Sequence, residues 1–307
     1  MSSIVNFNEL FDLSINKYSW ESDLIIIAGP TCVGKSSIAV SLAKKINGAI
    51  INGDSIQVYK DLSLLSARPT TPDMQGIPHF LYGYVNSKTN YSVTDWLFQI
   101  KLKLIEIKKL QKIPILVGGT GLYLNAVING LAPIPVISKK NKEATLLKFN
   151  EIGIDEFTKM VVEIDPAYSQ KNNDKHRLLR AYSIYLETGK NISYWHGLPR
   201  EKNVDKKIYS FLINADRQSL YEKCDKRFNN MLFKGGLDEA KYLYNQNIDR
   251  SLPVSKSLGV KWLLSYLDNE ITYEDAVRLS IRDTRRYVKR QITWFKHNYI
   301  PYKIILM

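Results

Sequence analysis

The sequence predicts an α/β fold in which a parallel β-sheet carries helices on both faces. Three observations support this prediction. Apolar runs of strand length occupy residues 24–28, 49–52 and 113–117, and a helical pattern over residues 94–109 precedes the last of them. The first run leads directly into a glycine-rich loop. Strands that alternate with helices are typical of βαβ units, whose strands run parallel.

The middle of the chain predicts a helical insertion into this sheet. Residues 131–135, Leu-Ala-Pro-Ile-Pro, interrupt the alternation, and the lysine-rich stretch that follows is helix-like. A strand pattern returns only at residues 208–213. A strand that returns after a helical excursion indicates that the excursion is inserted, and we expect a helical domain at residues 137–205.

The last third of the chain is almost wholly helical in pattern. Residues 217–300 carry helical periodicity, with turns expected near residues 235–236, 252–253 and 268–269. We therefore expect a discontinuous core formed by residues 1–136 and 206–307.

The glycine-rich loop at residues 29–36 has the pattern G-x-x-x-x-G-K-S of a phosphate-binding loop. Its glycines let backbone N–H groups turn inward onto phosphate oxygens, the lysine supplies a charge, and the serine hydroxyl of Ser36 can hold Mg²⁺. The loop lies between a strand and a helix, as the motif requires. We predict a P-loop NTPase-like core that binds phosphate or pyrophosphate through Gly29, Pro30, Thr31, Cys32, Val33, Gly34, Lys35 and Ser36.

Polar residues follow the next two strands. Asp54 comes after the second strand and Thr120 after the third. Ligands bind beyond the carboxyl ends of parallel strands, so both side chains are expected near the phosphate loop. The alternative is that both are ordinary turn residues. The third strand ends in Gly-Gly-Thr-Gly and not in an aspartate that holds Mg²⁺, which argues against a motor-type or switch-type NTPase.

Positive charge is concentrated in the last third of the chain. The formal net charge is +13, and residues 206–307 hold 19 basic and 11 acidic side chains. A helix over residues 282–296 would place Arg282, Arg285, Arg286 and Lys289 on one stripe and Val288, Ile292 and Phe295 on another. With Tyr287 and Trp294 interleaved, the basic stripe suits a nucleic-acid backbone with stacked bases. The alternative is a surface helix whose Trp294 belongs to the core.

A second basic group lies in the expected insertion. If residues 176–180 are helical, His176 and Arg180 share a face, and Arg177 lies on the same side. The alternative is a helix face that is simply solvated.

Composition limits the remaining possibilities. No apolar run approaches the ~18 residues of a membrane span, and no secretory leader pattern is present. The two cysteines, Cys32 and Cys224, lie far apart in the sequence and have no metal-ligand spacing, which favours free thiols in a reducing compartment. We expect a cytoplasmic monomer with no membrane partner.

Taken together, the motifs resemble those of the tRNA dimethylallyltransferase family, also called tRNA isopentenyltransferases. Asp-Ser-Ile-Gln-Val-Tyr at residues 54–59 matches the D-S-x-Q-x-Y box, and Val-Gly-Gly-Thr-Gly-Leu-Tyr-Leu at residues 117–124 is nearly the family sequence. The resemblance covers roughly residues 24–297. Further matching segments, in order, are residues 67–70, 77–79, 91–95, 173–174 with 176–180, 188–189, 227–231, 259–261 and 284–295.

Some residues depart from the family pattern. They are Leu65-Ser66, Arg68, Phe80 and Val260, and they bear on RNA contacts more than on the chemistry. The chain also ends soon after the basic helix, without the zinc-finger tail of eukaryotic relatives, so we expect a bacterial type.

The resemblance implies transfer of a dimethylallyl group from dimethylallyl pyrophosphate to N6 of the adenosine 3′ of the tRNA anticodon. It implies Asp54 as the base, with Thr120 and Lys35 as the other catalytic residues, Arg227 on the donor pyrophosphate and Mg²⁺ on Ser36. The adenine would leave its stack to reach the donor. The anticodon stem-loop would contact Asp54, Ser55, Ile56, Gln57, Thr120, Lys142, His176, Arg177, Leu178, Leu179, Arg180, Lys256, Ser257, Leu258, Gly259, Val260, Lys261, Lys289, Arg290, Gln291, Ile292, Thr293, Trp294, Phe295 and Lys296.

Three alternatives stay open at this point. An adenylate isopentenyltransferase would use the same donor with free AMP or ADP, but it would not need the basic C-terminal region. A small-molecule P-loop kinase would require ATP, and the sequence leaves open whether ATP binds the loop. A non-catalytic RNA-binding module would leave Asp54 and Lys35 unexplained.

Overall fold

The structure is a computed structural model that describes residues 3–5, 18–168, 174–202 and 204–307. The chain divides into two compact units, which are described separately. The first comprises Met1–Ile128 and Asn203–Met307, and the second comprises Asn129–Lys202. The helical unit therefore begins before the boundary expected at residue 137, because the connection that contains Pro133 and Pro135 groups with the helices.

The first unit is built on one parallel sheet. Over the described residues its seven strands have the order β1-β7-β6-β2-β5-β3-β4, and every neighbouring pair is parallel. The four strands expected from apolar runs are confirmed, while the three short strands at the sheet margins had no clear signal. The strands are β1 (Ser3–Val5), β2 (Asp23–Ala28), β3 (Gly48–Asn52), β4 (His79–Phe80), β5 (Ile113–Gly118), β6 (Lys207–Asn214) and β7 (Lys303–Leu306).

Both faces of the sheet are covered. The central strands read as continuous apolar runs, and β2 and β5 are buried at every residue, as expected for strands with helices on both sides. On one face, Ile25 and Ile27 join a core with Ile38 and Leu42 of α2 (Lys35–Lys45). Leu24 and Ile26 point to the opposite face and are also buried. The predicted α/β class is confirmed.

The helix expected over residues 94–109 is α4 (Val93–Lys109), which packs against β3 and β5. Its start is fixed by a capping box, in which the Ser92 side chain accepts from the Asp95 N–H and the Asp95 carboxylate accepts from the Ser92 N–H. The indole of Trp96 donates to the Asn52 carbonyl over 3.0 Å and so ties α4 to the end of β3. Two further helices flank these strands, α3 (Thr71–Met74) and α5 (Gly121–Asn129).

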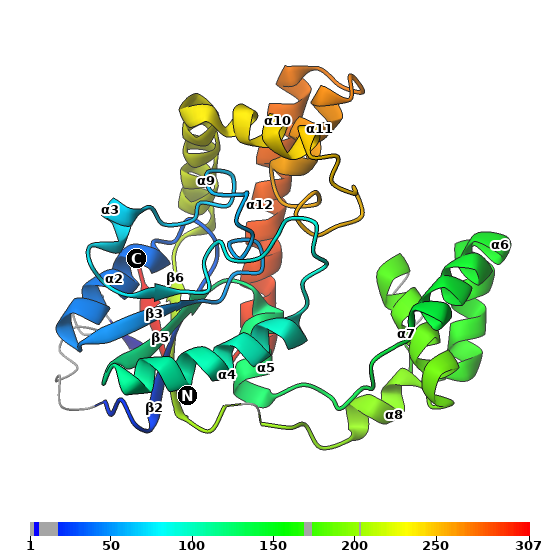
Figure 1. Ribbon diagram of the computed structural model, residues 1–307, viewed down its shortest axis with the longest axis horizontal. Helices are drawn as coiled ribbons and strands as arrows, with labels where there is room; N and C mark the ends of the chain where they lie inside the picture. The colour runs from blue at the N-terminus through cyan, green and yellow to red at the C-terminus, as the bar shows by residue number, and fades with distance from the viewer. Residues whose placement is uncertain (1–2, 6–17, 169–173, 203) are drawn as a thin grey trace. The chain divides into compact units, whose positions relative to one another are not determined.

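The C-terminal helices stand beside the sheet, with α12 packed along α9 (Figure 1). The break expected at residues 235–236 is present: Gly235 has a non-helical backbone with φ 100° and kinks the segment η2, which lies between α9 and α10. The breaks expected near residues 252–253 and 268–269 do separate helices. The elements are α9 (Arg217–Met231), η2 (Leu232–Gly236), α10 (Leu237–Asn245), α11 (Val260–Leu267) and α12 (Tyr273–Asn298).

The second unit is helical, as the insertion was expected to be. It contains α6 (Lys139–Ile164), α7 (Lys175–Thr188) and α8 (Ile192–Gly197). Its core is formed by Phe149, Phe157, Val161, Leu178 and Ala181. Leu178 is fully buried there, so its side chain supports the packing of α7 and is not on the surface where tRNA contact was expected.

The sheet brings three strand ends together at one edge. The phosphate loop follows β2, Asp54 follows β3 and Thr120 follows β5, and these strands are parallel neighbours in the order β2-β5-β3. The backbones of the latter two turns touch: Gly53 N–H donates to the Val117 carbonyl over 2.7 Å. A Cβ on Gly118 would lie 2.2 Å from the Gly53 carbonyl oxygen, so this approach requires glycine.

We predict that Gly118→Ala lowers the free energy of unfolding by about 1–3 kcal/mol or more, because the clash is with backbone and cannot be relieved by a side-chain rotation. Urea unfolding followed by circular dichroism measures the change. Gly197→Ala is the matched control, since nothing lies within 4 Å of its added Cβ. Equal stability of the two variants would contradict the close approach of the two turns.

Candidate active site

The phosphate loop has the open backbone that anion binding requires. Gly29 has φ +153°, and a Cβ there would lie 2.5 Å from the Ile213 carbonyl oxygen of β6. The loop then enters α2 at Lys35, and no acidic residue lies in the first turn of that helix. The N-terminal N–H groups and the dipole of α2 therefore face the loop without a competing carboxylate, which favours a bound anion.

Lys35 is folded over the loop. Its Nζ donates to the Pro30 carbonyl oxygen over 2.7 Å. Burial lowers the pKa of Lys35 to about 8, and the nearby carboxylate of Asp54 opposes that shift. The amine is thus mostly charged at neutral pH and lies close enough to Asp54 for the two charges to interact.

Two side chains from the C-terminal helices hold the loop. Arg227 of α9 donates from Nη2 to Thr31 Oγ1 over 2.7 Å. Gln291 of α12 accepts from the Thr31 N–H over 2.9 Å and donates from Nε2 to the Gly119 carbonyl over 2.9 Å. Arg227 was predicted at the pyrophosphate, and it does lie at the loop. Gln291 was expected to contact tRNA, but it is buried and links the phosphate loop to the end of β5.

Asp54 is held in a defined orientation by the start of its own loop. Its Oδ1 accepts from the Ile56 N–H over 2.8 Å and from the Gln57 N–H over 3.4 Å. Asn52, fully buried, accepts from the Asp54 N–H and donates to the Asp54 and Leu81 carbonyls. Among the described residues, no hydrogen bond engages the second carboxylate oxygen of Asp54, which leaves it to accept a proton. Asp54 is therefore also a turn residue, as the alternative proposed, because its Oδ1 binds the N–H groups of its own turn.

Thr120 lies beside this loop. Its Oγ1 accepts from the Ser55 N–H over 3.2 Å, so it joins the turn after β5 to the turn after β3. Tyr287 of α12 is a residue that the sequence reading assigned only to base stacking. Burial raises its pKa, with a further contribution from the charge of Asp54, so its phenol belongs to the surroundings of Asp54.

The phosphate loop, Asp54, Arg227 and Gln291 line one cavity of about 610 Å³, whereas Thr120 and Tyr287 are not among its lining residues. Lys35, Ser36, Asp54 and Arg227 all line it, which brings the predicted donor-binding residues and the predicted base into one site. The Ser36 hydroxyl is exposed at the start of α2 and is an oxygen donor of the kind Mg²⁺ prefers. The described residues contain no cluster of three or more His, Cys, Asp or Glu side chains that would hold a metal by themselves.

The far wall of the cavity is formed by residues 63–70, and one carboxylate shapes it. Glu239 of α10 accepts from the N–H groups of Ser63, Leu64 and Leu65 over 2.5, 2.9 and 2.8 Å. Ser63 and Leu64 line the cavity. Glu239 was not found by sequence reasoning because it is more than 170 positions away from its partners.

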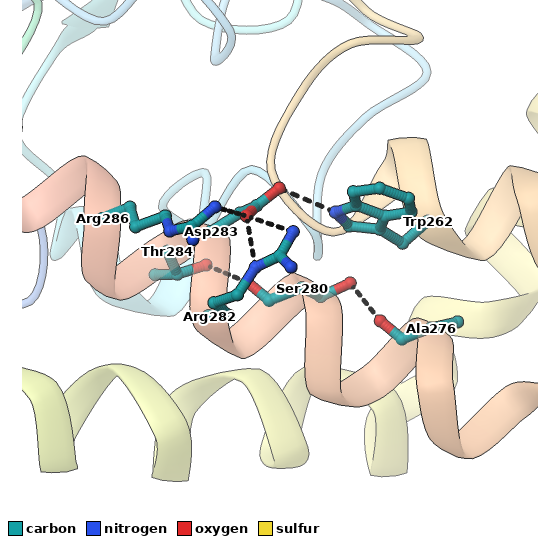
Figure 2. A network of polar contacts seen from close by, with 7 residues as sticks. All are labelled: Trp262, Ala276, Ser280, Arg282, Asp283, Thr284 and Arg286. Atoms are coloured by element: carbon teal, nitrogen blue, oxygen red, sulfur yellow. Dashed lines mark hydrogen bonds and ion pairs between the residues drawn. The ribbon is translucent and has the colours of Figure 1, made fainter.

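Acidic neighbours engage part of the basic stripe on α12. Asp283 accepts hydrogen bonds from the indole of Trp262 over 2.8 Å and from Arg282 over 3.0 Å, and its carboxylate lies 3.8 Å from the guanidinium of Arg286. Figure 2 shows the guanidinium groups of Arg282 and Arg286 directed at this carboxylate. Arg285 forms an ion pair with Asp225 of α9. Lys289 and Arg290 are exposed, and the guanidinium of Arg290 lies over the Tyr287 ring.

Several of the residues expected to contact tRNA have side chains in the core. Trp294 is half-buried against Gly121, where an added Cβ would lie 2.5 Å from its ring, so its ring packs α12 against α5. The exposed side chains of the set are Lys142, His176, Arg177, Arg180, Lys256, Lys261, Lys289, Arg290, Thr293 and Lys296. Those that are buried and offer no side-chain surface are Leu178, Ser257, Val260, Gln291 and Phe295.

Comparison with known proteins agrees with this geometry. A family model described as IPP transferase matches residues 57–298, and a model described as isopentenyl transferase matches residues 22–89. A protein of Pelagibacter ubique named tRNA dimethylallyltransferase is 40% identical over 277 residues, which are 89% of this chain and 88% of the relative. The chain belongs to the tRNA dimethylallyltransferase family. The family predicted from the motifs is confirmed.

Other relatives of this tRNA dimethylallyltransferase family agree. A Hyphomonas neptunium protein of the same name is 38% identical over 88% of this chain and 86% of its own length. The crystal structure of a Bacillus halodurans tRNA isopentenylpyrophosphate transferase superposes with a TM-score of 0.67 at 32% identity, covering 93% of this chain and 89% of that one. A structure of a eukaryotic dimethylallyltransferase acting on tRNA gives a TM-score of 0.79 at 29% identity, covering 93% and 73%.

We predict that Glu239→Gln lowers the free energy of unfolding by about 1–3 kcal/mol, because the three N–H groups lose a charged acceptor. Chemical denaturation measures the loss. Glu270→Gln, an exposed glutamate of the same unit, is the matched control and should change stability little. If Glu239→Gln were as stable as the control, the carboxylate would not hold this wall of the cavity.

Proposed function

We propose that the protein transfers a dimethylallyl group from dimethylallyl pyrophosphate to N6 of the adenosine 3′ of the anticodon in tRNA. The observation that carries the proposal is the shared cavity, in which a phosphate loop with Lys35 and Arg227 faces the carboxylate of Asp54. Membership of the tRNA dimethylallyltransferase family supports it.

The phosphate loop would hold the pyrophosphate of the donor. An allylic C–O bond ionises early because the allylic cation is delocalised, so the main task is to stabilise the departing anion. Backbone N–H groups of the loop, the ammonium of Lys35 and the guanidinium of Arg227 would together stabilise it. We also propose that the Thr120 hydroxyl, which lies beside the Asp54 turn, is a further donor to the anion.

We also expect Mg²⁺ at the phosphate loop, beside the pyrophosphate. The Ser36 hydroxyl would bind it together with pyrophosphate oxygens, and when bound the ion would neutralise charge on the leaving group. Because the described residues hold no cluster of three or more acidic, histidine or cysteine side chains, the ion would depend on the donor for most of its ligands.

Asp54 would act as the base. The exocyclic amine of adenine is a weak nucleophile, because its lone pair is shared with the ring. As the N6–carbon bond forms and the carbon–oxygen bond to pyrophosphate breaks, Asp54 takes the proton from N6. The Ile56 and Gln57 N–H groups hold one carboxylate oxygen, which aims the other at the acceptor.

The acceptor would be an unstacked base of an RNA loop. A base inside a stack cannot reach a donor in a cavity, so the adenine would be flipped out. The exposed basic side chains on α12, together with those of α7, would hold the RNA backbone.

None of the described helices is long and apolar enough to cross a bilayer. The cytoplasmic location and monomeric state stay predictions.

The test is a competition between acceptors. The protein is incubated with dimethylallyl pyrophosphate, Mg²⁺, unmodified tRNA and AMP, and the prenylated products are quantified by mass spectrometry. Prenylated tRNA with AMP unmodified is the expected result. Prenylated AMP alone would establish the adenylate isopentenyltransferase alternative. In a parallel incubation that also contains ATP, phosphate transfer without prenyl transfer would establish a kinase.

We predict that Asp54→Asn lowers the rate of the chemical step by about 10²-fold or more, because the amide keeps the turn but takes no proton. Single-turnover transfer at saturating donor and tRNA measures it. Donor and tRNA dissociation constants should change little, as should all parameters of Asp238→Asn, an exposed aspartate on α10. Near-wild-type turnover would show that Asp54 only caps its turn.

We predict that Lys289→Ala combined with Arg290→Ala weakens tRNA binding and makes its dependence on salt shallower. Each lost phosphate contact should reduce the slope of log K against log salt by somewhat under one unit. Filter binding at several salt concentrations measures the slope. The charge-matched control is Lys108→Ala with Lys109→Ala, at the end of α4; the same slope in both double variants would make α12 a structural helix only.

A further inference from the structure

Two thiols meet at the phosphate loop. Cys32 lies in the loop and lines the cavity, and Cys224 is buried in α9. Their Sγ atoms are 2.9 Å apart, and both cysteines are free. The sequence spacing does not predict this contact, because 192 positions separate the two cysteines. A disulfide has a sulfur–sulfur bond of about 2.05 Å, so a small movement would join them.

The surroundings favour reaction at Cys32. The hydrogen bond from Cys224 lowers the pKa of Cys32 to about 7, and the charges of Arg227 and Lys35 act in the same direction against its burial. The thiolate is the nucleophile in thiol oxidation, and a partly exposed thiol beside cations is the kind that reacts. Cys224, buried in the core, is then placed to resolve the oxidised form.

We propose that Cys32 and Cys224 are a reversible redox pair, in which a peroxide converts the two thiols into one disulfide and thereby weakens pyrophosphate binding. The Cys32 thiolate attacks a peroxide oxygen, a sulfur–oxygen bond forms as the oxygen–oxygen bond breaks, and the leaving hydroxide is protonated to water. The Cys224 sulfur then attacks Cys32, the sulfur–oxygen bond breaks, and the second water leaves with the Cys224 proton. The two thiols lose two electrons and the peroxide gains them.

The disulfide would change the loop more than the helix. Cys224 is 1% exposed and belongs to the same core as Ile25 and Ile38, so its position is fixed by packing. Cys32 is only partly buried, and its left-handed backbone, with φ 64°, is a strained conformation for a residue other than glycine. The movement that closes the bond therefore falls on Cys32, and it shifts the N–H groups that would face the pyrophosphate. Arg227, one turn after Cys224, contacts Thr31 beside the same point.

The inference rests on the proposed function only in taking this loop as the pyrophosphate site. Conversely, a bound pyrophosphate covers Cys32 and repels its thiolate. We therefore expect inorganic pyrophosphate to slow the oxidation, since both compete for the same face of the loop.

The test uses the full chain, hydrogen peroxide and inorganic pyrophosphate as the probe. Peptide mapping should find a Cys32–Cys224 link, and calorimetry should find pyrophosphate affinity lowered several-fold in the oxidised protein and restored by dithiothreitol. Cys224→Ser and Cys224→Ala should bind pyrophosphate normally when reduced, form no link, and leave Cys32 as a sulfenic acid that dimedone traps.

Two results would overturn the proposal. One is a wild-type protein whose Cys32 stays a thiol or persists as a sulfenic acid after peroxide treatment. The other is a disulfide that forms without changing pyrophosphate affinity. Peptide mapping detects the disulfide whether or not the protein binds pyrophosphate. Calorimetry on the reduced protein tests pyrophosphate binding whether or not the disulfide forms. Failure of this inference and failure of the proposed function are therefore separate results.

Discussion

The amide of Gln291 is the contact on which the geometry of the site depends. It accepts from the Thr31 N–H of the phosphate loop and donates to the Gly119 carbonyl at the end of β5, over 2.9 Å in both cases. A Cβ on Gly119 would lie 2.5 Å from this amide, so the turn is shaped around it. An amide is suited to this place because it carries a donor and an acceptor side by side, and both backbone groups would otherwise be unpaired in the interior.

This contact gives α12 two tasks. Gln291 on its buried face holds the phosphate loop, while its outer face carries exposed Lys289 and Arg290. The same helix thus connects the proposed donor site with the proposed RNA-binding surface. Arg227 adds a second link from α9 to Thr31, and α9 in turn is paired with α12 through Asp225 and Arg285. The donor loop is therefore held by residues that follow Thr31 in the chain by 196 and 260 positions.

How far the sequence predicts this arrangement depends on the range of the interaction. The buried strands, the phosphate loop and α4 are encoded in contiguous residues, so apolar runs and a capping box are enough to find them. Strands β4 and β7 are short and depend on pairing with β3 and β6, which local pattern does not show. Gln291 and Glu239 bind backbone groups that are far away in the sequence. A polar residue in a helical pattern does not indicate which distant backbone groups its side chain will bind. Leu178 was expected to contact tRNA because it lies in a basic matching segment, and its burial follows from the packing of α7 in the helical unit.

The most direct test of this account is the pair of ligand affinities of Gln291→Ala. If the amide shapes the phosphate loop, inorganic pyrophosphate should bind about tenfold more weakly, which corresponds to one hydrogen-bonded pair left unmade, while tRNA affinity changes little. Calorimetry with pyrophosphate and filter binding with unmodified tRNA measure the two constants on the same preparation. Unchanged pyrophosphate affinity together with a loss of tRNA affinity would contradict the account and return Gln291 to the RNA-binding surface.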